Sequence, residues 1–226
     1  MELNIAVCVK SVPDPELYSN ITLDPVTKTL KREGVNAVVN PADKHALELA
    51  IQLKEQYGAS VTLISMGPPD AQKQLREALA YGADAAVLLS DRKFGGADSL
   101  ATSYILAQGA KKAGNFDLIL AGNESADGAT THVPSQIGEW LDLPHVMEVV
   151  DFKLTEEGSA IVRKKADGKY YEFEVQLPAV IAVAKEINKV RIPKIKDIFA
   201  AKKKPLDIYA AEDFADLDLK YVGLQG

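Results

Sequence analysis

The chain has 226 residues, which is enough for one large domain or for a domain with a long tail. Its 47% hydrophobic and 26% charged residues are typical of a globular protein and argue against general disorder. A net charge of −6 is the wrong sign for a protein that follows a nucleic-acid backbone, so no nucleic-acid partner is expected. The single cysteine, Cys8, excludes an internal disulfide.

The apolar runs in the sequence are short. Residues 5–9 and 180–184 are far below the ~20 residues that a membrane helix needs. The N-terminus carries Glu2 and lacks the basic start and long apolar segment of a signal peptide. We therefore expect a soluble, cytoplasmic protein without membrane insertion.

Buried strands alternate with amphipathic helices along the first two thirds of the chain. Asn40 and Pro41 are typical of a helix start, Gly58 ends that helix, and Asp98 caps another. Runs rich in β-branched residues predict the strands. The strands are expected at 3–10, 61–66, 85–89 and 118–121, with two short ones within 21–39, and the helices after Asn40, after Pro69, at 98–113 and at 131–141.

The pattern changes after Val146. Three strand-like segments surround an Asp167-Gly168 hairpin signal, and residues 178–184 predict one more central strand. The segment from residue 187 is basic and loosely patterned, with too few apolar residues for a core. The fold class is therefore α/β: a doubly wound, mostly parallel, Rossmann-like sheet with a β-hairpin excursion. We expect a nucleotide-binding domain at 1–186 and an extended partner-binding tail at 187–226.

Ligands of open parallel sheets bind outside the carboxyl ends of the strands, where the strand order reverses. This rule points to residues 8–12, 66–68 and above all to 122–131, a segment with two glycines and two hydroxyls that leaves a strand and enters a helix. Backbone N–H groups there can approach an anion near the helix N-terminus. A plain strand-to-helix turn capped by Asp127 is the alternative, because neither common phosphate-binding fingerprint is present.

Other candidates for chemistry are weaker. Cys8 lies in a buried run, where a thiol is usually inert. His45, His132 and His145 lack the spacing of metal ligands, so no metal site is expected. No pair of nucleophile and base can be named, so no catalytic residue is assigned.

Several motifs together resemble the electron-transfer flavoprotein β subunit. They are CVKSVPD at 8–14, NPADKHALELAIQLKE at 40–55, SMGPPDAQKQLREALAYGAD at 65–84, LAGNESADGATTHVPSQIGEWLDLP at 120–144, LPAVIAVA at 177–184 and AAKKKP at 200–205. The resemblance covers nearly the whole chain in order. It implies a Rossmann-like fold and a heterodimer with an α subunit that carries its own FAD.

The resemblance also implies an adenine nucleotide in the strand-end cleft. Conventional members hold AMP there, whereas electron-bifurcating members hold a second FAD that accepts electrons from NADH. The segment SDRKFGGADSLATS at 90–103 is similar to the bifurcating branch and favours FAD. The chain is then an electron carrier subunit, which takes part in NADH oxidation only if this FAD is present.

Carried over residue by residue, the resemblance implies one set of nucleotide contacts. The adenine edge would meet the backbone around Ala6 and Met66, and the phosphates would meet Gly128, Thr130 and Thr131. The full set is Ala6, Cys8, Lys10, Asn40, Asp43, Met66, Gly67, Gly122, Asn123, Asp127, Gly128, Ala129, Thr130 and Thr131.

Bifurcating relatives commonly show D-G-D-T-A-Q-V, where this chain has DGATTHV at 127–133, so FAD and AMP both stay open. The chain also stops at Gly226, sooner than longer members of the family. A truncated chain and a shortened relative are both compatible with that length.

The resemblance extends to partners. Residues 191–201 are similar to the loop that docks acyl-CoA dehydrogenase-type partners, with Ile195 at the apolar anchor position. A plain surface crossover held to the α subunit is the alternative for this segment. Bifurcation would add ferredoxin or flavodoxin as a low-potential acceptor. The competing hypothesis for the whole chain is a stand-alone adenine-nucleotide-binding α/β protein.

Overall fold

A nine-stranded sheet forms the centre of the molecule. The computed structural model of the protein describes residues 3–20 and 36–225. The strand order is β11-β5-β4-β1-β6-β10-β7-β8-β9, with β11 through β7 parallel and β7, β8 and β9 antiparallel. The strands are β1 (Asn4–Cys8), β4 (Ser60–Met66), β5 (Ala85–Leu89), β6 (Leu118–Gly122), β7 (His145–Leu154), β8 (Ser159–Ala166), β9 (Lys169–Gln176), β10 (Ala179–Val183) and β11 (Leu206–Tyr209).

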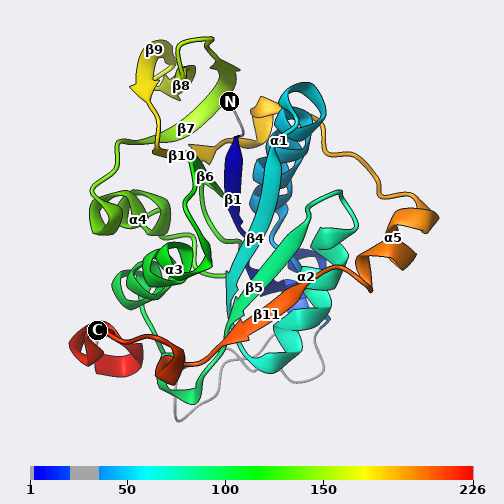
Figure 1. Ribbon diagram of the computed structural model, residues 1–226, viewed down its shortest axis with the longest axis vertical. Helices are drawn as coiled ribbons and strands as arrows, with labels where there is room; N and C mark the ends of the chain where they lie inside the picture. Colours follow the sequence, from blue (N-terminus) through cyan, green and yellow to red (C-terminus); the bar gives the residue numbers. More distant parts are fainter. Residues whose placement is uncertain (1–2, 21–35, 226) are drawn as a thin grey trace.

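Helices cover both faces of this sheet, as Figure 1 shows. Helices α1 (Pro41–Tyr57) and α2 (Gln72–Leu79) pack on one face, and α3 (Ser99–Ala113) and α4 (Val133–Leu141) on the other. The predicted fold class, a doubly wound and mostly parallel α/β sheet, is therefore confirmed.

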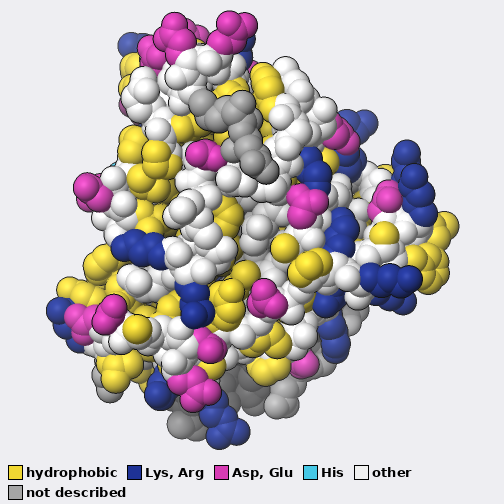
Figure 2. Space-filling model, viewed as in Figure 1, with side chains coloured by type: hydrophobic (Ala, Val, Ile, Leu, Met, Phe, Trp, Pro, Cys, Tyr) yellow, Lys and Arg dark blue, Asp and Glu magenta, His cyan; other side chains and the backbone are white. Residues whose placement is uncertain are grey.

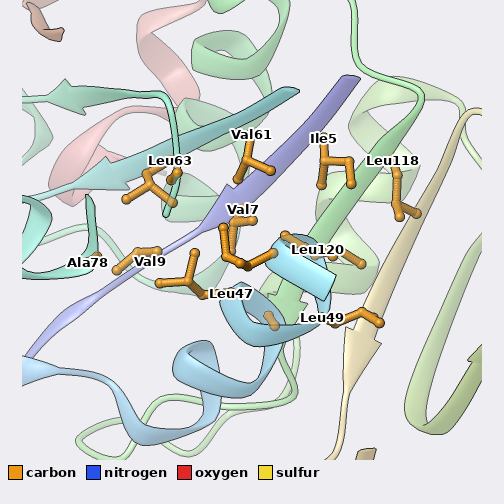
Figure 3. Close-up of a cluster of buried hydrophobic side chains, with 14 of the residues drawn as sticks. Ile5, Val7, Val9, Leu47, Leu49, Val61, Leu63, Ala78, Leu118 and Leu120 are labelled. Carbon is orange, nitrogen blue, oxygen red and sulfur yellow. The ribbon is translucent and has the colours of Figure 1, made fainter. Parts of the chain in front are cut away.

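The central strands are apolar on both faces because each face carries its own core. Ile5 and Val7 of β1 point to the α1 side and belong to the same buried cluster as Leu47 (Figure 3). Ala6 and Cys8, the alternate residues, belong to the cluster beneath α3 and α4. Side chains of a strand alternate between its two faces, so a strand covered on both faces must be apolar throughout.

The predicted helix boundaries agree with the structure. Helix α1 follows Asn40 and ends at Gly58, whose φ of +74° is the left-handed conformation that favours glycine. Helix α3 begins after Asp98, whose side chain accepts a hydrogen bond from Ala101 N at 2.9 Å. One expectation was wrong in detail: Asn40 occupies the N-cap position, but its side chain makes no cap hydrogen bond.

Strands β7, β8 and β9 extend the sheet as an antiparallel ribbon, the predicted hairpin excursion. Asp167 and Gly168 form the turn between β8 and β9 with φ values of +50° and +72°. Both values suit the Asp-Gly pair of a tight hairpin. Of the two short strands predicted within 21–39, residues 37–39 form β3 (Ala37–Val39), which pairs with β2 (Ser11–Pro13). Residues 21–35 lie outside the described residues.

The C-terminal segment contributes to the sheet. Helix α5 (Ile195–Ala201) lies on the α2 side, and β11 then pairs with β5 in parallel, with Leu206 beside Ala86 and Tyr209 beside Leu89 (Figure 1). The sequence analysis predicted neither element. The chain then reaches the opposite face, where Tyr221 packs against Tyr104 and Trp140. The partner-binding role of residues 187–226 stays a prediction.

None of the helices within residues 3–20 and 36–225 is long and apolar enough to cross a membrane.

Candidate functional site

The strand order reverses next to β1. The chain passes from β1 to β4 and β5 on one side and then crosses to β6 on the other side. The carboxyl ends of β1 and β6, at Cys8 and Gly122, therefore flank the place where an open parallel sheet binds its ligand.

A buried carboxylate ties these two strand ends to helix α1. Asp43, in the first turn of α1, is 6% exposed. Its Oδ2 accepts a hydrogen bond from Lys10 N at 2.7 Å, and its Oδ1 accepts one from Gly122 N at 3.2 Å. One side chain thus satisfies two backbone donors, one just after β1 and one at the end of β6, and both of its oxygens are engaged within the protein.

Asn40 holds the loop after β6 in the same way. It is 1% exposed; its Nδ2 donates to the carbonyl of Glu124 at 2.9 Å, and its Oδ1 accepts from Ala126 N at 3.0 Å. This use of the amide explains why the side chain does not cap α1. The predicted N-cap residue instead fixes the start of the glycine-containing loop.

Lys10 reaches the far side of that loop. Its Nζ lies 2.6 Å from Asp127 Oδ1 and 3.2 Å from Ser125 Oγ. The Lys10 side chain is half-exposed, whereas the Asp127 side chain is almost fully buried. Five predicted site residues are therefore joined in one hydrogen-bonded network: Lys10, Asn40, Asp43, Gly122 and Asp127.

The remainder of the loop is exposed and carries unusual backbone conformations. Ala129 and Thr131 have φ values of +47° and +60° without being glycine, and residues 128–131 are exposed. Such strained conformations concentrate at functional sites. Helix α4 starts directly afterwards, and the first N–H groups of a helix have no partner within it. Asp127 does not cap α4, because His132 occupies that position.

The other predicted contacts lie outside the network. Met66 is the last residue of β4 and Gly67 follows it, and both are half-buried. Ala6 is fully buried within β1, in register with Thr62 and Ile119. Asn123 turns away from the network, because its amide pairs with Glu148, a β7 residue with φ of +59°.

Burial controls the titration of the two acidic groups at this strand end. It raises the pKa of Asp43 to about 7, against the hydrogen bonds from Lys10, Asn40 and Gly122, which lower it. Burial, with a smaller contribution from Asp43, raises the pKa of Cys8 to about 12. The thiol is therefore neutral and unreactive near neutral pH, as the sequence analysis expected.

A second surface feature lies around α5. We call residues 191–204 the arm. Its apolar side chains Ile192, Ile195, Ile198 and Phe199 are 90%, 75%, 47% and 62% exposed. Figure 2 shows hydrophobic and Lys or Arg side chains side by side at this position. The exposed lysines of the arm are Lys194, Lys196, Lys202 and Lys203.

Sequence reasoning missed several residues at both places. Ser125 binds Lys10, and Glu148 binds Asn123, although nothing in the sequence singled out either one. Glu48 is almost completely buried in α1 and binds Arg191 of the arm. Glu48 stands among apolar residues of the predicted helix, a signal that could have pointed to a buried ion pair.

The fold and this site define a class: a doubly wound α/β protein with a hydrogen-bonded polar network at the carboxyl ends of its parallel strands. Comparison with known proteins identifies the family within this class. The model of the family described as "Electron transfer flavoprotein domain" matches residues 27–214.

Named relatives agree with this match. An "Electron transfer flavoprotein subunit beta" of Clostridium acetobutylicum is 45% identical over 225 residues, covering 99% of this chain and 84% of the relative. The "Caffeyl-CoA reductase-Etf complex subunit CarD" of Acetobacterium woodii is 45% identical over 212 residues, 93% of this chain and 79% of the relative. "Protein FixA" of Azorhizobium caulinodans is 37% identical over 232 residues, 99% of this chain and 81% of the relative. The chain belongs to the electron transfer flavoprotein family and is similar to its β subunits.

Proposed function

We propose that this chain is the β subunit of an electron-transfer flavoprotein heterodimer and holds FAD in the cleft at the carboxyl ends of β1, β4 and β6. The observation that carries the proposal is the buried network in which Asn40, Asp43 and Lys10 fix the loop after β6. The loop continues into the exposed residues 128–131 at the start of α4, where Ala129 and Thr131 have positive φ values.

The exposed part of this loop suits a phosphate. The N-terminal end of α4 favours negative charge, and its first backbone N–H groups need an external acceptor. Thr130 and Thr131 add two hydroxyl groups beside these donors. Gly122 allows the start of α1 to approach β6 closely, which brings the elements of the cleft together.

FAD is the nucleotide that we favour, and AMP is the alternative. Residues 90–103, which are similar to the bifurcating branch, follow β5 at the edge of the sheet that carries the cleft. A bound flavin would supply redox chemistry, with NADH as the electron donor, while the protein contributes position and electrostatics. AMP would be a structural cofactor only.

The partners proposed for the chain are the α subunit, an acyl-CoA dehydrogenase-type flavoprotein and, with bifurcation, ferredoxin or flavodoxin. We assign docking of the dehydrogenase to the arm. Its exposed isoleucine and phenylalanine side chains, among lysines, suit a partner that offers an apolar pocket with an acidic rim. The name of the Acetobacterium relative places that protein in a reductase complex, which supports a partner of this kind.

The test is to purify the chain together with its α subunit and to count cofactors. Two flavins per heterodimer, measured by absorbance and by chromatography of the denatured extract, support FAD in the β-subunit cleft. One flavin together with one AMP supports the conventional carrier. Failure to pair with any flavin-containing α subunit would overturn the heterodimer and favour a stand-alone nucleotide-binding protein.

A further inference from the structure

The arm has almost no core of its own. From residue 191 to residue 200 every residue is exposed or half-buried, and Ala201 is the first buried one. A cavity of about 510 Å³ separates part of the arm from α1 and the turn after α2, with Ile51, Lys54 and Tyr81 among its lining residues. Packing beneath the arm therefore does little to hold its apolar side chains in place.

The first end of the arm is attached to α1 through Arg191. Its guanidinium donates to both carboxylate oxygens of Glu48, at 2.9 and 3.0 Å, and to both of Glu55, at 2.6 and 3.0 Å. The backbone N–H of Arg191 donates to Glu48 as well, at 3.1 Å. The two glutamates are seven residues apart, about two helical turns, so they lie on one face of α1.

Glu48 is buried, so its charge depends on Arg191 for compensation. The side chain of Glu48 is 4% exposed, and the only other side-chain donor recorded for it among the described residues is Gln52. Removing one partner of a buried ion pair leaves an uncompensated charge, which is strongly unfavourable. The planar guanidinium can serve two carboxylates at once, which a lysine ammonium cannot reproduce.

The second end of the arm is attached to α2. Arg76 donates to the carbonyls of Ala201 and Lys204, at 3.0 and 2.6 Å. Lys204 in turn donates to the carbonyls of Leu79 and Ala83, at 3.1 and 2.6 Å. Charged side chains therefore hold both ends, and the exposed apolar residues lie between them.

We propose that Arg191 is a positioning residue that fixes the arm in its docking conformation before the partner arrives. The inference rests on the docking role proposed for the arm and extends it to a residue whose guanidinium binds α1. An arm that is already ordered loses less conformational entropy on binding, which strengthens association without any new contact. Loss of Arg191 should therefore weaken docking and leave the chemistry at the flavins unchanged.

The first test needs no dehydrogenase. Limited trypsin digestion of the purified α/β complex cleaves after Lys194 and Lys196 when the arm opens. We expect the arm of Arg191→Gln to be cut about tenfold faster than that of the wild type, with Arg191→Lys in between. The double variant Arg191→Gln, Glu48→Gln removes the buried unpaired charge, so it retains the fold while still losing the attachment.

The second test is the steady-state reduction of the acyl-CoA dehydrogenase-type partner. For the double variant we expect KM for the partner to rise about tenfold, with kcat within about twofold of wild type and nucleotide content unchanged. Arg163→Gln is the matched control, because it removes an arginine paired with Asp151 at 3.4 Å on the distant ribbon. That variant should match the wild type in both assays.

The outcomes separate this inference from the docking proposal. If Ile195→Ala raises KM while the Arg191 variants show wild-type cleavage and wild-type KM, docking stands and the positioning role is wrong. If Ile195→Ala also has no effect, the docking role falls and this inference falls with it. Faster cleavage together with a higher KM in the Arg191 variants supports both.

Discussion

Gly122 lies so close to Asp43 that a β-carbon on the glycine would stand 2.6 Å from the carboxylate oxygen Oδ1. The same β-carbon would lie 2.6 Å from the carbonyl carbon of Ala42. Real side chains do not approach backbone atoms so closely, so the end of β6 accepts only glycine if α1 keeps its position. The hydrogen bond from Gly122 N to Asp43 depends on this approach.

Replacing Gly122 with alanine should therefore move α1 away from β6. We expect a loss of about 1–3 kcal/mol in the free energy of unfolding, as for overpacked cores, together with lower nucleotide content. Urea denaturation and chromatography of the denatured extract measure the two effects. Gly95→Ala is the control for stability, because a β-carbon there meets only the Arg92 carbonyl, at 3.2 Å. Equal stability of the two variants would contradict the assignment.

The raised pKa of Asp43 predicts how the stability of the nucleotide-free protein depends on pH. Below the ordinary aspartate pKa, near 4, Asp43 is protonated in both the folded and the unfolded chain. Between that value and about 7, the folded chain keeps the proton and the unfolded chain has lost it. The contribution of Asp43 to the free energy of unfolding therefore falls as pH rises through this window, by about 1.4 kcal/mol per unit of pKa shift.

Denaturant unfolding at pH 5 and pH 8 measures this contribution. The Asp43→Asn variant should lose less stability than the wild type between these two pH values. Glu55 supplies a contrast of opposite sign, because its hydrogen bonds from Arg191 lower its pKa. Its contribution is present at both of these pH values and is lost only as pH falls below 4.5, the ordinary glutamate pKa, so a further measurement at about pH 3 is needed, and Glu55→Gln should remove that loss. An unchanged pH dependence in Asp43→Asn would show that Asp43 ionises normally in the folded protein.

The two threonines at the start of α4 are expected to hold phosphate. Replacing both Thr130 and Thr131 with valine removes two hydroxyl groups at nearly constant size, and we expect nucleotide occupancy to fall about tenfold or more. Thr131 has a φ of +60°, a strained conformation for a β-branched residue. Thr131→Gly is therefore the control, since it removes the hydroxyl and relieves the strain together. Full occupancy in the double valine variant would remove the threonines from the phosphate site.

The arm predicts a separate defect. Ile195→Ala removes most of a side chain that is 75% exposed, so folding and flavin content should stay as in the wild type. Electron delivery to the dehydrogenase should slow about tenfold, as for an interface anchor. The matched control is Leu219→Ala, because Leu219 is 54% exposed in another part of the surface. Equal rates for Ile195→Ala and the wild type would exclude Ile195 as the anchor.

The sequence by itself determined the layered α/β fold, since the signals for it are local. Apolar runs with β-branched residues indicated the central strands, Asp98 and Gly58 marked helix ends, and Asp167-Gly168 marked the hairpin. Each of these signals depends only on neighbouring residues. Strand β11 and helix α5 were not predicted because they are short and half-exposed. Strand β11 forms by pairing with β5, more than 100 residues away in the chain.

Only the tertiary structure decided what the site residues do. Asn40 has the sequence pattern of a helix cap, yet its amide bridges Glu124 and Ala126 on a loop more than 80 residues away. Asp43 is a nucleotide contact by resemblance, but its two carboxylate oxygens accept hydrogen bonds from the backbone of Lys10 and Gly122. Arg191 belongs to a basic segment in the sequence, but it finds a buried carboxylate on α1. A polar side chain binds whichever group the fold brings within about 3 Å, and sequence spacing does not encode that distance.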